Sequence, residues 1–418
     1  MADTPTLIPG GWKSIRLGEV AETKSGGTPS RDNPSYYIGS IPWLKSGELN
    51  DDEIIDAEER INEEAIESSS AKVFAPGTLL VAMYGATVGK TGLLMISSAT
   101  NQAICAIIPR NGEFLPEFMM YYMVFRRNDL LNQRYGAAQP NISQQLLRNL
   151  EVTLPPVSEQ REIARVVTTI RRARHAARQV IEAAREMKRS VMMALFRGQE
   201  DEGQETELGV LPAGWNVEKI GDLFDIQQGK ALSPAARTGD SPRPFLRTAN
   251  VLWGRIDVTS VDQMDFSEEE AEFYELKPED LLICEGGDIG RTAMWNGELE
   301  PCYYQNHLHR LRPKQDGLVS RFYMYWMDAA MNLFGLYVGQ GNLTTIPNLS
   351  KGRLSAFLVP VPAYAQQKAI ARHIMAIDEK IRLEESRIAK LQDLYQTLLH
   401  DLVSGKVRLK AKEVEANA

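Results

Sequence analysis

Cysteine and histidine are scarce in this sequence, which narrows the kinds of site it can contain. The three cysteines, Cys105, Cys284 and Cys302, are far apart in the chain. Neither a disulfide framework nor a cysteine-based zinc cluster is expected, and a reduced, cytoplasmic setting is favoured. The five histidines lack the spacing of metal ligands, so we expect no metal site.

Long apolar runs are also missing. No stretch of about 18 apolar residues occurs, so no membrane span is expected. Residues 1–5 lack the basic flank and apolar core of a signal peptide, and none is expected. The 418 residues are enough for two or three globular domains.

Positive charge is in short supply as well. The net charge is −8, which counts against a simple nucleic-acid binder. The distribution is uneven, because residues 158–198 hold 10 Lys and Arg against 4 Asp and Glu, whereas residues 1–157 and 199–363 are acidic. Any DNA contact by the acidic parts therefore requires local basic patches.

No catalytic motif is complete. Gly85–Thr91 has one residue too few between its glycines for a phosphate-binding P-loop, and Gly92–Ile96 after it has the pattern of a strand where that motif needs a helix. We interpret the stretch as a hairpin turn. Asn33–Tyr36 resembles the Asn-Pro-Pro-Tyr motif of adenine methyltransferases but lacks one proline, and no methyl-donor loop is found.

The clearest positive feature is an internal repeat. Seven short blocks return in the same order about 201 to 207 residues later; Pro9–Trp12, for example, returns as Pro212–Trp215. The matched residues are mostly glycine, proline, tryptophan and apolar types, which determine turns and cores. The stretches between the blocks differ, as Gly26–Tyr37 does from Gly229–Pro242. The pattern predicts two α/β modules with one scaffold and different loops.

Each module ends in a segment with a heptad pattern. Apolar or small residues alternate at spacings of three and four over about five heptads, which predicts two helices of roughly 60 Å. One position of the second seam is Glu384. A helix with such a stripe must bury it, and we expect the two helices to pair antiparallel; separate packing of each helix on its own module is the alternative. The expected interface residues are Ile163, Val166, Ile170, Ala177, Val180, Met187, Val191, Ile370, Ile374, Ile377, Ile381, Ile388, Leu391 and Leu398.

Basic and aromatic residues beside the matched turns are candidates for DNA contacts, since such side chains bind phosphates and base edges. The pairs Lys45/Arg247 and Lys90/Arg291 are cationic in both modules and are expected to contact phosphate, whereas unaligned residues suit base recognition. For each one, a solvated surface charge is the alternative. The candidates are Lys24, Arg31, Tyr36, Tyr37, Lys45, Tyr84, Lys90, Lys230, Arg237, Arg243, Arg247 and Arg291.

The arginines of the first helix leave two interpretations open. They could contact the DNA backbone or an acidic partner, or they could form a solvated helix face. They are Arg165, Arg171, Arg172, Arg174, Arg178, Arg185 and Arg189.

These features together resemble the DNA-specificity subunits of type I restriction–modification systems. The resemblance rests on the repeated Pro-x-Gly-Trp opening, on Leu154–Ile163 at the start of the first helix and on Leu195–Gly198 at its end, and it covers essentially the whole chain. The start of the second helix, Val359–Gln367, departs from the family pattern in its second proline and its acidic residue.

The resemblance implies a fold and a set of partners. Two target recognition domains, each a twisted β-sheet with small helices, would be arranged with pseudo-two-fold symmetry and joined by an antiparallel coiled coil that acts as a ruler. The subunit itself would be non-catalytic and carry no cofactor. It would bind double-stranded DNA and two modification subunits, which use S-adenosylmethionine, and restriction subunits would complete the enzyme.

The predicted division of the chain follows from the repeat and the helices. It is residues 1–157 for the first recognition domain, 158–198 for the first helix, 199–209 for an acidic linker, 210–363 for the second recognition domain, 364–405 for the second helix and 406–418 for a tail. Two other functions remain as alternatives: a stand-alone diverged DNA methyltransferase or NTPase, and a coiled-coil scaffold for proteins that does not bind DNA.

Overall fold

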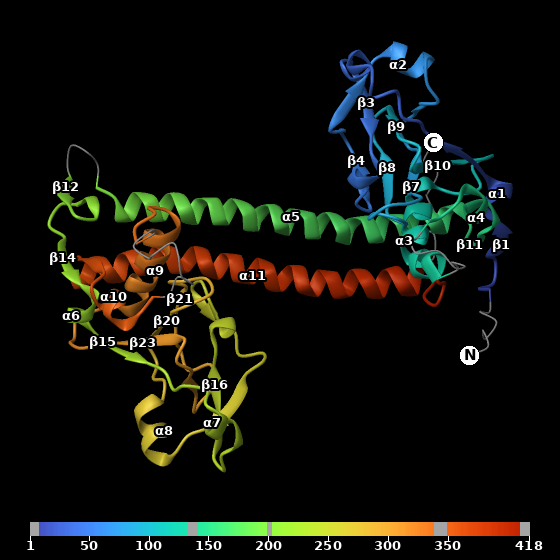
Figure 1. The fold of residues 1–418 in the computed structure, drawn as a ribbon. Helices are drawn as coiled ribbons and strands as arrows, with labels where there is room; N and C mark the ends of the chain where they lie inside the picture. Colours follow the sequence, from blue (N-terminus) through green and yellow to red (C-terminus); the bar gives the residue numbers. More distant parts are fainter. Residues whose placement is uncertain (1–7, 133–140, 199–202, 338–348, 410–418) are drawn as a thin grey trace, which may run out of the picture. The chain divides into compact units, whose positions relative to one another are not determined.

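The structure, a computed structural model, describes residues 8–132, 141–198, 203–337 and 349–409. Its contacts separate the chain into two compact units (Figure 1). Unit 1 consists of Met1–Ala177 with Arg387–Ala418, and unit 2 of Arg178–Ser386. Each unit therefore contains a globular part and one segment of each of two long helices.

The larger sheet of unit 1 has the strand order β2-β10-β7-β8-β4. The side chains of β7 alternate between two apolar clusters, with Leu79 and Val81 in one and Leu80 and Ala82 in the other. Because both faces of the sheet are covered here, the strand is a continuous apolar run. The strands are β2 (Ala21–Ser25), β4 (Asp52–Ile54), β7 (Leu79–Ala82), β8 (Thr91–Leu94) and β10 (Ile104–Pro109).

A smaller sheet has the strand order β5-β3-β9-β6, and the buried Trp43 lies on its strand β3. The buried indole N–H of Trp43 donates to the Gly27 carbonyl at 3.0 Å, which ties this sheet to the end of β2. Its strands are β3 (Ile41–Leu44), β5 (Glu59–Ile61), β6 (Val73–Phe74) and β9 (Ser98–Thr100), and β1 (Lys13–Arg16) pairs separately with β11 (Glu151–Leu154). The helices are α1 (Leu17–Val20), η1 (Pro34–Tyr37), η2 (Ser46–Glu48), α2 (Glu63–Glu67), α3 (Pro116–Asn132) and α4 (Gln144–Asn149).

Unit 2 repeats this architecture. Its larger sheet has the order β15-β23-β20-β21 and its smaller sheet the order β19-β16-β22, while β14 pairs with β24. The strands are β14 (Asn216–Lys219), β15 (Phe224–Gln228), β16 (Pro242–Leu246), β19 (Asp262–Asp265), β20 (Leu281–Cys284), β21 (Thr292–Met294), β22 (Tyr303–Tyr304), β23 (Leu308–Pro313) and β24 (Leu358–Val361). The helices are α6 (Ile220–Leu223), α7 (Pro234–Thr238), η3 (Thr248–Asn250), α8 (Glu268–Tyr274), α9 (Ser320–Asn332) and α10 (Lys351–Ser355). The duplication predicted from the sequence is therefore present in the fold.

The two units differ beside the β7–β8 hairpin and its counterpart. In unit 1, β4 extends the larger sheet by pairing in parallel with β8. In unit 2 the corresponding segment folds into a separate hairpin of β17 (Val251–Leu252) and β18 (Arg255–Ile256). The shared scaffold thus tolerates different secondary structure at this place.

The long helices are α5 (Val157–Phe196) and α11 (Tyr364–Val403). Unit 1 contains the beginning of α5 and the end of α11, and Ile163 and Leu402 lie in the same core. In unit 2, Arg185 pairs with Glu385 at 3.1 Å and Lys188 with Asp378 at 2.8 Å. Because the numbers rise along α5 as they fall along α11, the two helix segments of this unit are antiparallel. None of the helices in the described part of the chain combines the length and hydropathy needed to cross a membrane.

The burial of the predicted interface residues is uneven. Two predictions were wrong: Val180 and Met187 are 39% and 58% exposed, while Ile181 is buried and the Lys188 side chain is only 17% exposed. Neighbouring residues are about 100° apart on a helix, so spacing alone does not choose between Val180 and Ile181. One heptad further along, Lys188 rather than Met187 faces inward. A pattern of apolar residues does not include a lysine, so it selected Met187 instead. Ile163, Ile170, Ala177, Ile370 and Ile374 are buried, and Val166, Val191, Ile377, Ile381, Ile388, Leu391 and Leu398 are half-buried.

The segment predicted as an acidic linker contains a hairpin. Strand β12 (Gly203–Thr206) pairs with β13 (Gly209–Pro212), and the N–H of Gly198 donates to the Val210 carbonyl at 3.1 Å. Leu208 and Leu211 are buried in the same cluster as Phe196 at the end of α5. These apolar residues hold the hairpin on the helix, so the prediction of a linker over 203–209 was wrong; residues 199–202 lie outside the described residues.

Candidate nucleic-acid interface

The glycine-rich stretch Gly85–Lys90 connects two antiparallel strands, β7 and β8. It is a hairpin turn, as predicted, and presents no helix N-terminus to a phosphate. Lys90 at its end lies 3.4 Å from the carboxylate of Asp51 and keeps 40% of its side chain exposed. The turn therefore carries a cation at the surface rather than a nucleotide site.

The near-match to a methyltransferase motif has a structural role. Asn33 caps η1, where its Oδ1 accepts the Ser35 N–H at 3.3 Å and the Ser35 hydroxyl at 2.7 Å. Tyr36 packs beside the Trp43 cluster. The polar side chain of Asn33 is thus used by the turn itself.

Two of the candidate DNA-contacting residues, Lys24 and Tyr84, lie near one end of the larger sheet in unit 1. Lys24 is on β2 and pairs with Glu22 at 3.0 Å. Tyr84 follows β7, is exposed, and forms an isolated bridge with Asn141. The strand register, with Ser25 opposite Cys105, brings the ends of β2 and β7 to the same side as the Gly85–Lys90 turn.

Arg31, Tyr37 and Lys45 form a second group around Glu59, beside the smaller sheet. Arg31 pairs with Glu59 at 2.8 Å and lies 4.0 Å above the Tyr37 ring, while Lys45 reaches Glu59 at 3.2 Å and Glu58 at 2.9 Å. The hydrogen bond from Arg31, above all, holds the pKa of Glu59 below its ordinary value. Burial raises the pKa of Tyr37, whose hydroxyl donates to the Pro29 carbonyl at 2.7 Å. These cations are therefore already paired with carboxylates of their own unit.

The candidates of unit 2 are engaged in the same way, with one exception. Carboxylates pair with Lys230 at 2.6 Å, Arg243 at 2.5 Å, Arg247 at 3.1 Å and Arg291 at 3.2 Å. The partners are Glu270, Glu268, Asp262 and Asp288 respectively. Arg237 in α7 is exposed, and no ion pair to it is found among the described residues.

Eight of the nine candidate cations are therefore paired with an acid of their own unit within the described residues. The acidic composition of the globular parts accounts for this, because acids are available beside each cation. Exposed ion pairs contribute only about 0–1 kcal/mol each, so at the more exposed cations, such as Lys24 and Arg31, a phosphate can replace the carboxylate at little cost. Lys230 and Arg291, with 14% and 17% of their side chains exposed, are the least accessible of the eight.

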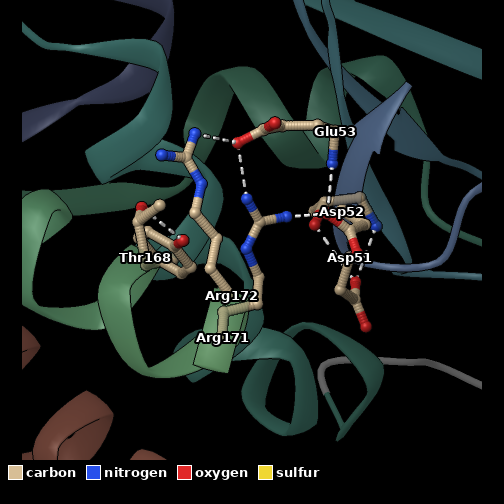
Figure 2. Close-up of polar contacts among 8 residues, drawn as sticks. Asp51, Asp52, Glu53, Thr168, Arg171 and Arg172 are labelled. Carbon is tan, nitrogen blue, oxygen red and sulfur yellow. Dashed lines mark hydrogen bonds and ion pairs between the residues drawn. The ribbon is translucent and has the colours of Figure 1, made fainter. Parts of the chain in front are cut away.

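A polar cluster links α5 to β4 in unit 1 (Figure 2). Arg171, only 11% exposed, pairs with Asp52 and with Glu53 at 2.6 Å, and Arg172 reaches Glu53 at 3.2 Å. Both arginines point from the helix toward the strand. Of the two interpretations left open for the helix arginines, neither fits Arg171, which attaches the globular part of unit 1 to α5.

Unit 2 attaches its globular part through other groups. Tyr325 of α9 donates its hydroxyl to Asp378 at 2.8 Å, and Asp378 also pairs with Lys188. The aligned tyrosine in unit 1, Tyr121, bonds with Thr168 at 2.8 Å. Both units have a tyrosine at this position of the helix. The ion pairs beside it differ, because unit 1 uses Arg171 with Glu53 and unit 2 uses Lys188 with Asp378.

Two glutamines that were not among the candidates make the same contacts in both units. Gln160 accepts the Leu115 N–H at 2.8 Å and donates to the Pro155 carbonyl at 2.9 Å. Gln367 accepts the Val319 N–H at 2.9 Å and donates to the Pro362 carbonyl at 2.9 Å. Their alignment in the repeat was the signal, and their role is to join each long helix to the loop before α3 or α9.

The tryptophan of the first Pro-x-Gly-Trp block contacts the start of α5. Trp12 donates its indole N–H to Glu159 at 3.1 Å, and Arg408 pairs with the same carboxylate at 2.7 Å. Burial alone would raise the pKa of Glu159, but the hydrogen bonds from Arg408 and Trp12 lower it below its ordinary value. Arg408 and Leu409 of the predicted tail thus contact the globular part of unit 1, whereas residues 410–418 lie outside the described residues.

Comparison with known proteins gives consistent matches. A family model described as the type I restriction modification DNA specificity domain matches residues 9–183 and again 212–393. The MjaVIII specificity subunit of Methanocaldococcus jannaschii is 22% identical over 426 residues, covering 96% of this chain and 94% of that subunit. The EcoR124I/EcoR124II specificity subunit of Escherichia coli is 25% identical over 162 residues, covering 37% of this chain and 39% of that subunit.

Solved structures share the fold. The S subunit of a type I restriction–modification system from M. genitalium superposes with a TM-score of 0.64 at 16% identity, covering 96% of this chain and 98% of that one. A chain from a study of complex assembly and conformational transition of the type I R-M system has a TM-score of 0.57 at 21% identity, covering 96% and 100%.

Proposed function

The chain belongs to the type I restriction–modification DNA specificity family, and on this premise we propose that its two units read the two halves of a bipartite, asymmetric DNA sequence. A specificity subunit supplies DNA recognition within a multi-subunit enzyme and is not its catalytic subunit. Residues 1–157 and 210–363 are the proposed target recognition domains.

The observation that carries this proposal is one scaffold with two different sets of loops. The sheets of the two units share a central strand order, to which unit 1 adds β4 and β6, yet Gly26–Tyr37 contains the short helix η1 where Gly229–Pro242 contains helix α7. Loops carried on a rigid scaffold are where binding residues concentrate, and different loops suit different bases. An asymmetric target follows.

The candidate residues take two roles in this proposal. Lys45, Arg247, Lys90 and Arg291 are cationic in both units and contact phosphates, which requires charge but no particular base. The unaligned residues suit base recognition, since their types and positions differ between the units. They are Lys24, Arg31, Tyr36, Tyr37, Tyr84, Lys230, Arg237 and Arg243.

The long helices are the proposed spacer. α5 and α11 would form an antiparallel coiled coil that determines the distance between the half-sites and gives the chain a pseudo-two-fold arrangement. The antiparallel segments within unit 2 and the half-buried seam residues of α11 support this. Two modification subunits, which bind S-adenosylmethionine, and restriction subunits would assemble on the chain in the cytoplasm.

The proposal is tested by binding assays on the full chain with its modification subunit. Comparing the methylome of the host with and without this gene identifies the candidate target. Gel-shift titrations should then show binding to one bipartite site, with the affinity falling steeply as salt increases. Binding that ignores sequence, or that is insensitive to salt, would overturn the proposal.

A further inference from the structure

Asp51 occupies a backbone position that the sister unit gives to glycine. Asp51 has a φ of 62°, and its N–H donates to the Thr91 carbonyl at 2.8 Å. In unit 2 the N–H of Gly254, with a φ of 75°, donates to the carbonyl of Thr292 at 2.9 Å. Thr91 and Thr292 are aligned in the repeat, so the two positions are equivalent. Glycine adopts this left-handed conformation freely, and aspartate and asparagine are among the few other residues that tolerate it. Both units therefore make the same backbone turn, and unit 1 adds a carboxylate to it.

The Asp51 carboxylate fastens one end of the Gly85–Lys90 turn. It accepts the Thr91 N–H at 2.9 Å and the Thr91 hydroxyl at 3.1 Å, and it pairs with Lys90 and Arg127. Arg127 also donates to the Gly89 carbonyl at 2.8 Å. Only 17% of the Asp51 side chain is exposed. One carboxylate therefore holds the strand that leaves the turn, the backbone of the turn through Arg127, and the ammonium group of Lys90.

Strand β4, which begins directly after Asp51, connects this network to the long helix. Asp52 and Glu53, which follow Asp51, are held by Arg171 and Arg172 of α5 (Figure 2). The turn is thus joined through Asp51 and β4 to α5. Lys90, a candidate DNA contact, is therefore held in position relative to α5 through Asp51 and β4.

The charge of Asp51 is unfavourable for binding phosphate, because it neutralises one of two adjacent cations. A residue selected only for affinity would not be acidic here, and a residue selected only for the turn would be glycine, as in unit 2. What Asp51 contributes is the position of the turn. A phosphate contact carries no sequence information itself, but it sets the register of the unit on the DNA. The placement of Lys90 therefore decides whether base-reading side chains nearby, such as Tyr84, meet their bases.

We propose that Asp51 is a positioning residue for sequence recognition by unit 1, holding the Gly85–Lys90 turn and Lys90 where they meet DNA. This rests on the proposed function, in which unit 1 reads one half-site. Unit 2 places its turn differently: Arg291 donates directly to the Thr248 carbonyl at 2.7 Å. The proposal therefore applies to one half-site only.

The test is Asp51→Gly in the full chain bound to its modification subunit. The variant installs the residue of the sister unit, which suits the backbone, and removes the carboxylate. We expect affinity for unrelated DNA to rise roughly threefold to tenfold at low salt, because one negative charge beside Lys90 is lost. Discrimination against base changes should fall at least tenfold in one half-site and stay unchanged in the other. Asp51→Asn, which keeps an acceptor for Thr91 and tolerates the backbone, should lose less discrimination.

The matched control is Glu58→Gln. Glu58 also pairs with a candidate phosphate contact, Lys45, but its side chain is 69% exposed and it holds no turn, and Glu59 remains to orient Lys45. This variant should raise affinity for all DNA and leave discrimination unchanged. Equal effects of Asp51→Gly and Glu58→Gln, or equal loss in both half-sites, would overturn the role of Asp51. A wild-type complex without bipartite preference would overturn the proposed function instead, so the two failures are distinguishable.

Discussion

Gln160 lies fully buried at the start of α5 and accepts the backbone N–H of Leu115 at 2.8 Å. Its amide N–H groups also reach the carbonyls of Pro155 and Glu113. Substitution with alanine leaves one backbone donor and two acceptors buried without this partner, so Gln160→Ala should lower the free energy of unfolding by about 2–3 kcal/mol. Urea denaturation measures this. Gln145→Ala, at an exposed position of α4, is the control and should change stability by less than about 0.5 kcal/mol. Similar losses for both variants would contradict the role of Gln160.

The revised seam of α5 makes a second prediction. Ile181 is 5% exposed and Met187 is 58% exposed. Ile181→Ala removes buried methyl groups and should cost about 2–4 kcal/mol of unfolding free energy, whereas Met187→Ala should cost less than about 0.5 kcal/mol. Thermal and urea unfolding of the two variants decide the point. A larger loss for Met187→Ala would restore the original heptad assignment.

His309 predicts a pH-dependent contribution to stability in unit 2. Its ring is fully buried on β23, its Nε2 lies 2.8 Å from the Leu349 carbonyl, and burial lowers its pKa below the ordinary value of 6.5. The unfolded chain therefore binds this proton at a higher pH than the folded chain does. Stability should fall as the pH drops below 6.5, by at most about 1.4 kcal/mol per pH unit, until the pKa of the folded state is reached.

The measurement is urea unfolding at pH 7.5 and 5.5 for the wild type and for His309→Gln. The glutamine amide can still donate to the Leu349 carbonyl but does not titrate. The stability difference between the two pH values should be smaller in the variant. An equal difference in both proteins would mean that other groups cause the pH dependence.

The proposed ruler predicts a change in target spacing. Inserting one heptad into each of α5 and α11 lengthens each helix by about 10.5 Å, which corresponds to roughly three base pairs. The half-site bases should be unchanged while the gap between them widens. Methylome sequencing of a host carrying the modified gene gives both quantities. A gap that stays the same would contradict the ruler, and an insertion in only one helix, which breaks the pairing, should abolish bipartite binding.

Much of the fold could be predicted because it is encoded locally. The hairpin at Gly85–Lys90 follows from glycines between two apolar runs, and the long helices follow from heptads bounded by Pro155-Pro156 and Gly198. The duplication was visible because turns and cores constrain residue type strongly. Spacing failed where two adjacent residues were both plausible, as at Val180 and Ile181, or where a charged residue, Lys188, occupied an inward position.

The sequence by itself determined that the chain is two copies of one module with different loops, because turn and core residues recur in order while the residues between them do not. Only the tertiary structure decided which side chains meet. Asp51 gives no signal in the sequence, since its partners Lys90, Thr91 and Arg127 come from other elements and its equivalence to Gly254 rests on a backbone hydrogen bond. Ion pairs between segments far apart in the chain have no period and no motif, so the pairing of the candidate cations and the attachment of β4 to α5 became visible only once the chain was folded.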